Sequence, residues 1–142
     1  ISYVNGGISM STLAVGTIKS VSSAAPVFQN TSGTEKGQLA KAWVNFDGES
    51  TVSIRDSFNV SSITDNGSGD YTINFSSSFS NDDYSCVLQH SIDPHNGTSH
   101  GVTYIYGESS QTTSAIRLKN MNPSASSQGI DKEVVCAVIF GD

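Results

Sequence analysis

The stretch SSITDNGSGDYTINF, residues 61–75, decides the fold that the sequence predicts. Ile63 leads into a run of Asp, Asn and Gly residues, after which Tyr71, Ile73 and Phe75 alternate with polar residues. Alternation of apolar and polar side chains is typical of a strand with one buried face, and Asp, Asn and Gly favour tight turns. The stretch therefore predicts a β-hairpin.

The residues on both sides of this hairpin show the same strand-like character. No segment has a sustained helical spacing of apolar residues, and β-branched residues, Ser and Gly occur throughout the chain. Short apolar runs between turn-forming clusters predict strands at residues 12–21, 38–46, 51–58, 60–64, 71–75, 84–90, 102–106, 113–118 and 132–140. We expect an all-β, antiparallel β-sandwich of the jelly-roll-like kind.

Two of these strands indicate which faces are buried. Ala42, Val44 and Phe46 share one face of their strand, so Trp43 lies on the opposite face. Trp43 is therefore either covered by a partner or simply exposed. The last strand is apolar on both faces, which predicts that it is central in its sheet or covered on one side by another subunit. Its two sets are Val134, Cys136, Val138 and Phe140 on one face, and Val135, Ala137 and Ile139 on the other.

The first 37 residues differ from the rest, because they hold few large apolar residues and many Gly, Ser, Thr and Ala residues. Such a segment buries too little surface to order itself. We therefore predict an extended N-terminal arm at residues 1–37, which packs along other copies, and a β-sandwich domain at residues 38–142. The expected interface of this homo-oligomer consists of Leu13, Val15, Ile18, Val27, Phe28 and Trp43.

Composition excludes several classes of function. The net charge is −6, and the seven Lys and Arg residues are scattered, whereas nucleic-acid-binding domains cluster theirs. We expect no nucleic-acid partner. No run of about 18 apolar residues occurs, and the N-terminus has no basic region followed by an apolar stretch. We therefore expect a soluble protein without membrane insertion or a signal peptide.

Catalytic and nucleotide-binding motifs are missing from the sequence. It contains neither G-x-S-x-G nor GxxxxGK[ST]. Asp82 and Asp83 precede a predicted strand, while Asp65 and Asp70 belong to the predicted hairpin turn, where Asp supports local hydrogen bonds. We expect no enzymatic activity and no cofactor.

The three histidines are evenly spaced through HSIDPHNGTSH, residues 90–100, with Asp93 among them. Imidazole and carboxylate groups could bind a transition metal, especially around a three-fold axis. The segment DPHNG is a turn by composition, however, which favours an exposed loop around His95. We expect no metal site.

The two cysteines each lie inside an apolar strand-like run, YSCVLQ for Cys86 and VVCAVIF for Cys136. They do not have the CxxC spacing of a metal or redox site. The favoured interpretation is two buried thiols, and a disulfide is the alternative if the two strands are neighbours.

Aromatic, His and Asn residues near the predicted loops suggest a binding surface, because rings stack on sugar faces and amides bind hydroxyls. The alternative is that the tyrosines of this set fill the core. The candidate receptor contacts are His95, Asn96, His100, Tyr104 and Tyr106.

One part of the sequence resembles a known group of proteins. A segment of tail-fibre and other virion proteins of phages, notably marine cyanophages, is similar to three stretches of this chain in residue identity and order. The stretches are KAWVNF at residues 41–46, SIRDSFNVSSITDNG at residues 53–67 and GDYTINF at residues 69–75. The resemblance covers residues 12–79. It implies a trimeric structural protein of the phage particle, on its tail or capsid surface, and it carries no catalytic residues.

These expectations combine into one functional hypothesis. The chain is a non-enzymatic tail-fibre or appendage domain that assembles with other virion proteins and binds a host-surface glycan or protein. The alternative is a capsid decoration protein, or a filament subunit joined by N-terminal strand exchange. A third hypothesis, an enzyme acting on a surface polysaccharide, has only unpaired carboxylates in its favour.

Overall fold

The computed structural model describes residues 15–19, 26, 28–91, 102–122 and 128–141. The chain divides into two compact units, Ile1–Gly37 (unit 1) and Gln38–Asp142 (unit 2). A strand was predicted at residues 12–21, but the described residues 15–19 do not form one. This stretch contains Gly16, and Gly disfavours regular strands.

Unit 1 contains a small hairpin that the sequence did not predict. Strand β1 (Phe28–Gln29) pairs with β2 (Glu35–Gly37) in antiparallel orientation. Asn30 organises the turn, since its Oδ1 accepts hydrogen bonds from the backbone nitrogens of Ser32 and Thr34 at 3.1 and 2.9 Å. Every described side chain of unit 1 is exposed except that of Pro26, which is partly buried.

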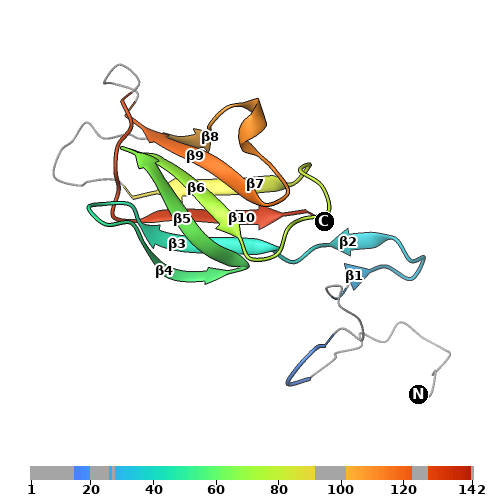
Figure 1. Ribbon diagram of the computed structural model, residues 1–142. Helices are drawn as coiled ribbons and strands as arrows, with labels where there is room; N and C mark the ends of the chain where they lie inside the picture. Colours follow the sequence, from blue (N-terminus) through green and yellow to red (C-terminus); the bar gives the residue numbers. More distant parts are fainter. Residues whose placement is uncertain (1–14, 20–25, 27, 92–101, 123–127, 142) are drawn as a thin grey trace. The chain divides into compact units, whose positions relative to one another are not determined.

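Unit 2 consists of two four-stranded antiparallel sheets packed together (Figure 1). Sheet 1 has the order β4-β3-β10-β7 and is formed by β3 (Ala42–Asp47), β4 (Ser53–Phe58), β7 (Ser85–His90) and β10 (Val135–Phe140). Sheet 2 has the order β5-β6-β9-β8 and is formed by β5 (Val60–Gly67), β6 (Asp70–Phe75), β8 (Val102–Ile105) and β9 (Ala115–Met121). The predicted all-β, sandwich-like fold is confirmed. A 3₁₀ turn, η1 (Glu108–Ser110), lies between β8 and β9.

The hairpin predicted from residues 61–75 is β5–β6, in which Ile63 pairs with Ile73. Its turn lies at Ser68 and Gly69. Gly69 has a φ of 67°, and a Cβ there would come within 2.5 Å of the Asn120 carbonyl oxygen and the Ile130 nitrogen. Only glycine fits this position, because it tolerates positive φ and leaves room for the neighbouring backbone.

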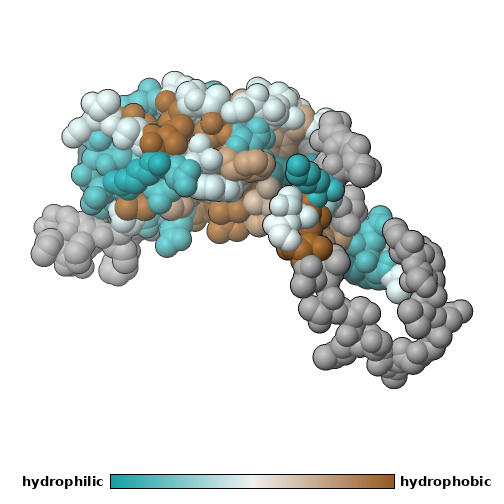
Figure 2. All heavy atoms as spheres, turned by 90° about the horizontal axis from the view of Figure 1, so that it is seen from below, coloured by the Kyte–Doolittle hydropathy of each residue, from teal (hydrophilic) through white to brown (hydrophobic). Residues whose placement is uncertain are grey.

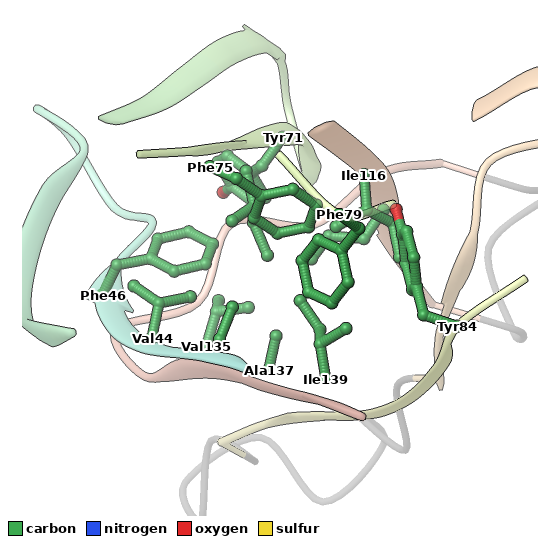
Figure 3. Close-up of a cluster of buried hydrophobic side chains, with 13 residues drawn as sticks. Val44, Phe46, Tyr71, Phe75, Phe79, Tyr84, Ile116, Val135, Ala137 and Ile139 are labelled. Carbon is green, nitrogen blue, oxygen red and sulfur yellow. The ribbon is translucent and has the colours of Figure 1, made fainter. Parts of the chain in front are cut away.

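The hydrophobic core lies between the two sheets (Figure 3). Both sheets contribute side chains to it, and the rings of Phe46 in sheet 1 and Tyr71 in sheet 2 meet edge to face with centroids 5.2 Å apart. Such ring pairs add about 0.5–1.5 kcal/mol to the stabilisation from buried area. The buried set is Ala42, Val44, Phe46, Tyr71, Ile73, Phe75, Phe79, Tyr84, Ile116, Leu118, Val135, Ala137 and Ile139.

The Tyr71 hydroxyl is the main polar contact at one end of this core. It lies 2.8 Å from the carbonyl oxygen of Gly48 and 2.8 Å from Oδ1 of Asp131. Burial, and next the hydrogen bond with Asp131, raise the pKa of Tyr71 above its ordinary value. The phenol therefore stays protonated and links strand β6 to the loops that contain Gly48 and Asp131.

The corner between the sheets is formed by Asn59, which joins β4 of sheet 1 to β5 of sheet 2. Asn59 has a φ of 55°, a left-handed conformation that Asn adopts more readily than most residues. Its Nδ2 donates to the carbonyl oxygens of Lys41 and Ser77, each at 3.1 Å, and its Oδ1 accepts from the Ser77 nitrogen at 2.8 Å. These bonds fix the direction in which the chain leaves sheet 1.

Strand β10 is central in sheet 1, as predicted, because β3 and β7 flank it. Its Val135, Ala137 and Ile139 are at most 1% exposed and face the core. The apolar residues on its other side therefore face away from the core. Among the described residues, no helix is long and apolar enough to cross a membrane.

Candidate functional site

Sheet 1 carries a line of apolar side chains across its outer face. Phe58 pairs with Trp43, Trp43 pairs with Val138, and Val138 pairs with Val87. Directly paired residues lie on the same face of a sheet, so the line crosses β4, β3, β10 and β7 in turn. Phe58 is 54% exposed and Val87 is 62% exposed, whereas Trp43 and Val138 are partly buried. We call these four residues the apolar row.

The neighbours of the apolar row limit its width. On one side, the next residues on the same face are Asp56, Asn45, Cys136 and Gln89. On the other side, Phe140 pairs with Ser85 and is 36% exposed. Figure 2 shows hydrophobic residues at the surface in several patches among hydrophilic ones. The row is thus a narrow apolar stripe with a mainly polar border.

The outer face of sheet 2 has the opposite character. Asn74 donates from Nδ2 to the hydroxyls of Ser62 and Thr64 at 3.1 and 2.9 Å. Asn66 donates in the same way to the Thr72 hydroxyl at 2.9 Å. Cross-strand bonds of this kind stabilise the sheet while its surface stays hydrophilic.

A charged group borders these amides and hydroxyls. Arg117 donates from Nε and Nη2 to the Asp70 carboxylate at 2.8 and 2.9 Å, and Lys119 Nζ lies 3.9 Å from it. The hydrogen bonds from Arg117 lower the pKa of Asp70, although burial opposes them. The Arg117 guanidinium carbon and Lys119 Nζ lie 4.5 and 5.0 Å from the centroid of the Tyr106 ring. We call these four residues the Tyr106 cluster.

A chain of polar side chains connects the two sheets in the interior. His90 Nδ1 of β7 lies 2.6 Å from the Thr103 hydroxyl of β8, which donates to Asn120 Oδ1 of β9 at 2.9 Å. Because the Thr103 hydroxyl donates its proton to Asn120, it can only accept from His90. The neutral His90 ring therefore donates from Nδ1 to the Thr103 oxygen. Burial lowers the pKa of His90, and the charge of Lys132 lowers it further.

The predicted receptor contacts are only partly among the described residues. Tyr104 pairs with Lys119 on the outer face of sheet 2, and its hydroxyl contacts the sulfur of Met121. Tyr106 is 39% exposed. Neither ring belongs to the core, so the alternative that these tyrosines fill it is wrong. His95, Asn96 and His100 lie outside the described residues.

The predicted assembly residues occupy both units. Val15, Ile18 and Phe28 of unit 1 are 51%, 59% and 46% exposed. Trp43 lies on the outer face of sheet 1, as its alternation predicted, since Ala42 and Val44 are buried. Leu13 and Val27 lie outside the described residues. Sequence reasoning missed Phe58 and Val87, because only the register of the strands aligns them with Trp43.

The two cysteines are free, so the disulfide alternative is wrong. Their strands are neighbours, but Cys86 pairs with Ile139 and Cys136 pairs with Gln89. Cys86 therefore lies on the core side of sheet 1 and Cys136 on its outer side. Burial raises the pKa of the Cys86 thiol.

The described residues also form an open depression of about 360 Å³. Within the described parts of the chain, no three His, Cys, Asp or Glu residues form a group that could hold a metal ion. The depression lies where unit 2 begins and ends, and its surface is mostly polar. It is lined by Gln38, Asn81, Asp83, Ser85, Phe140 and Gly141.

The most distinctive surface features of unit 2 are therefore the apolar row on sheet 1 and the polar outer face of sheet 2. Comparisons of the chain with protein-family models, curated proteins and solved structures find no match.

Proposed function

We propose that this chain is a non-enzymatic structural domain of a phage virion, of the tail-fibre or appendage kind, which works as an oligomer and contacts the host surface. The observation that carries the assembly role is the apolar row on sheet 1. Exposed apolar patches with polar borders are typical of protein interfaces. The virion assignment rests on the resemblance of KAWVNF and the two segments that follow it.

We also propose that unit 2 has a jelly-roll-like topology and that three copies of the chain form a trimer. Sedimentation velocity of the purified chain tests the trimer, because a closed three-fold assembly gives one discrete species. A single species of three times the chain mass supports the proposal. A well-ordered monomer at all concentrations contradicts it.

For host contact, we propose the outer face of sheet 2 together with Tyr106, which follows its edge strand β8. Hydroxyl and amide side chains suit hydrogen bonds to sugar hydroxyls, and an exposed ring suits contact with a sugar face. A glycan array probed with the intact oligomer tests this role. We expect Tyr106→Ala to abolish binding and Glu49→Ala, a change in an exposed loop, to leave it unchanged. The absence of binding by the unaltered oligomer contradicts a glycan-binding role.

A second candidate is a capsid decoration protein or a filament subunit joined by N-terminal strand exchange. It is favoured by the edge strands β4, β7, β5 and β8, which offer backbone groups for pairing with an added strand. Electron microscopy distinguishes the two candidates. Open-ended polymers support the filament, whereas discrete particles support the appendage domain.

A further inference from the structure

We propose that the apolar row is covered by unit 1 of a neighbouring copy, with Val15 and Ile18 lying across β4, β3, β10 and β7. This inference rests on the proposed assembly function, and it names the segment that makes the contact. It concerns the outer face of sheet 1 and not a sheet edge, which separates it from strand exchange.

Exposure is the first argument for this occupant. Unit 1 holds apolar side chains that it does not bury itself, since Val15, Ile18 and Phe28 are 51%, 59% and 46% exposed. Its only described regular element is the hairpin β1–β2, and isolated two-stranded hairpins are marginally stable in water. Unit 1 therefore needs an external apolar surface.

Length is the second argument. Adjacent strands lie about 4.8 Å apart, so a line across four strands spans about 14 Å. A polyproline II chain rises about 3.1 Å per residue and has three residues per turn, so residues 15–19 cover about 12 Å between their first and last Cα atoms with Val15 and Ile18 on the same side. A stretch of these residues in that conformation therefore matches the length of the apolar row.

Charge is the third argument, and it disfavours the most obvious rival, a direct contact between the apolar rows of two copies. Residues 1–37 carry two lysines and one glutamate, which give a net charge of +1. Because the net charge of the whole chain is −6, residues 38–142 carry a net charge of −7. Two sandwich domains packed face to face through their apolar rows repel each other. The positive charge of unit 1 is attracted by the negative charge of the sandwich domain instead. Lys19 directly follows Ile18, and Asp56 is an exposed carboxylate beside the apolar row.

The chain contains its own probe for this contact, because Trp43 is its single tryptophan. We expect acrylamide to quench Trp43 weakly in the assembled protein and strongly after dissociation by dilution. Sedimentation velocity at the same concentrations measures assembly. Both measurements use the full-length chain.

Two variant pairs identify the surfaces. Val87→Asp changes the row, and its control Val102→Asp changes an exposed valine on the edge strand β8 of sheet 2. Ile18→Asp changes the arm, and its control Thr17→Asp adds the same charge next to it without removing an apolar side chain. These side chains are exposed, so the core is unaffected.

We expect V87D and I18D each to raise the half-assembly concentration by about tenfold or more, because a charge buried in an apolar contact is costly. The quenching of Trp43 in both should equal that of the dissociated protein. V102D and T17D should shift the half-assembly concentration by less than about threefold, since less than 0.7 kcal/mol is then lost.

Several outcomes overturn the inference. Normal assembly of V87D or I18D, or equally strong quenching of Trp43 in the assembled and dissociated protein, shows that another surface makes the contact, and the proposed function then stands. Equally weak quenching of Trp43 in the assembled protein and in a dilute monomer shows that assembly does not cover the apolar row, and it overturns the inference as well. A chain that never assembles contradicts the proposed function as well.

Discussion

Tyr71 shows how a hydroxyl can stabilise the end of a mainly apolar core. Its ring packs against Phe46, while its oxygen lies 2.8 Å from both the Gly48 carbonyl and the Asp131 carboxylate. A buried donor with two acceptors is costly to remove, because the acceptors then lose their partner. This residue belongs to both the hydrophobic core and the loop connections.

We therefore predict that Tyr71→Phe lowers the free energy of unfolding by about 1–2 kcal/mol. Urea unfolding followed by circular dichroism measures the change. Tyr106→Phe, at an exposed ring, is the control and should change stability by less than about 0.5 kcal/mol. Equal stability of Y71F and the unaltered protein would falsify the role assigned to this hydroxyl.

His90 predicts a pH dependence of stability. Its pKa in the folded protein lies below the ordinary value of 6.5 because of burial, so the unfolded chain binds a proton more readily. The contribution of His90 to stability is then constant above about pH 6.5 and falls as the pH drops below this value. The Asp70 carboxylate, whose pKa lies below 3.8, contributes a separate loss at more acidic pH.

The urea midpoint measured between pH 8 and pH 5 tests the His90 prediction. His90→Gln keeps a hydrogen-bonding side chain but cannot take up a proton. We expect a smaller loss of stability between pH 6.5 and pH 5 in this variant than in the unaltered protein. Identical slopes for the two proteins would show that other groups cause the dependence.

At the scale of elements, the corner at Asn59 controls how the chain passes from sheet 1 to sheet 2. Its side chain makes three hydrogen bonds, and its backbone has a φ of 55°. We predict that Asn59→Ala lowers the free energy of unfolding by about 2–4 kcal/mol, because the bonds are lost and alanine is strained in this conformation.

Asn59→Gly separates the two causes, because glycine accepts positive φ but makes no side-chain bonds. This variant should be less destabilised than N59A by about 1 kcal/mol. Guanidinium unfolding of both variants provides the comparison. Equal losses in the two variants would assign the whole effect to the hydrogen bonds.

The sequence predicted every strand of unit 2 because their signals are local. The run from Ile63 to Phe75 combines turn residues with alternation, and both features survive in β5–β6. The hairpin of unit 1 was missed, because Phe28 is its only large apolar residue and the Asn30 turn lies in a Ser- and Thr-rich stretch. Turn chemistry without alternation is a weak signal.

The candidate site was less predictable than the fold. Alternation placed Trp43 on an outer face, but Phe58, Val138 and Val87 join it only through the register of the strand pairs, of which β3–β10 and β10–β7 join strands that are distant in the sequence. The same holds for His90, Thr103 and Asn120, which meet because β7 and β8 lie in different sheets that approach each other. Such registers depend on the whole fold.

At the scale of the whole molecule, every core residue among the described parts of the chain belongs to unit 2, since the set runs from Ala42 to Ile139. We predict that a chain of residues 38–142 still unfolds cooperatively, with a Tm within about 4 °C of the full chain under dilute conditions, equivalent to about 1 kcal/mol. Calorimetry measures this. Assembly of the shortened chain should fail in sedimentation, and an unfolded shortened chain would contradict the prediction.

The two-sided apolar character of β10 has a consequence for folding. A shift of one residue along the strand would turn Cys136, Val138 and Phe140 towards the core in place of Val135, Ala137 and Ile139. Because both sets are apolar, hydrophobicity selects the correct register only weakly. Polar anchors just before the strand select it instead. Asp131 accepts from the Gly69 nitrogen at 2.7 Å, and the Lys132 carbonyl accepts from the Gly48 nitrogen at 2.9 Å. Without these anchors, β10 would be free to pair out of phase with both of its neighbours.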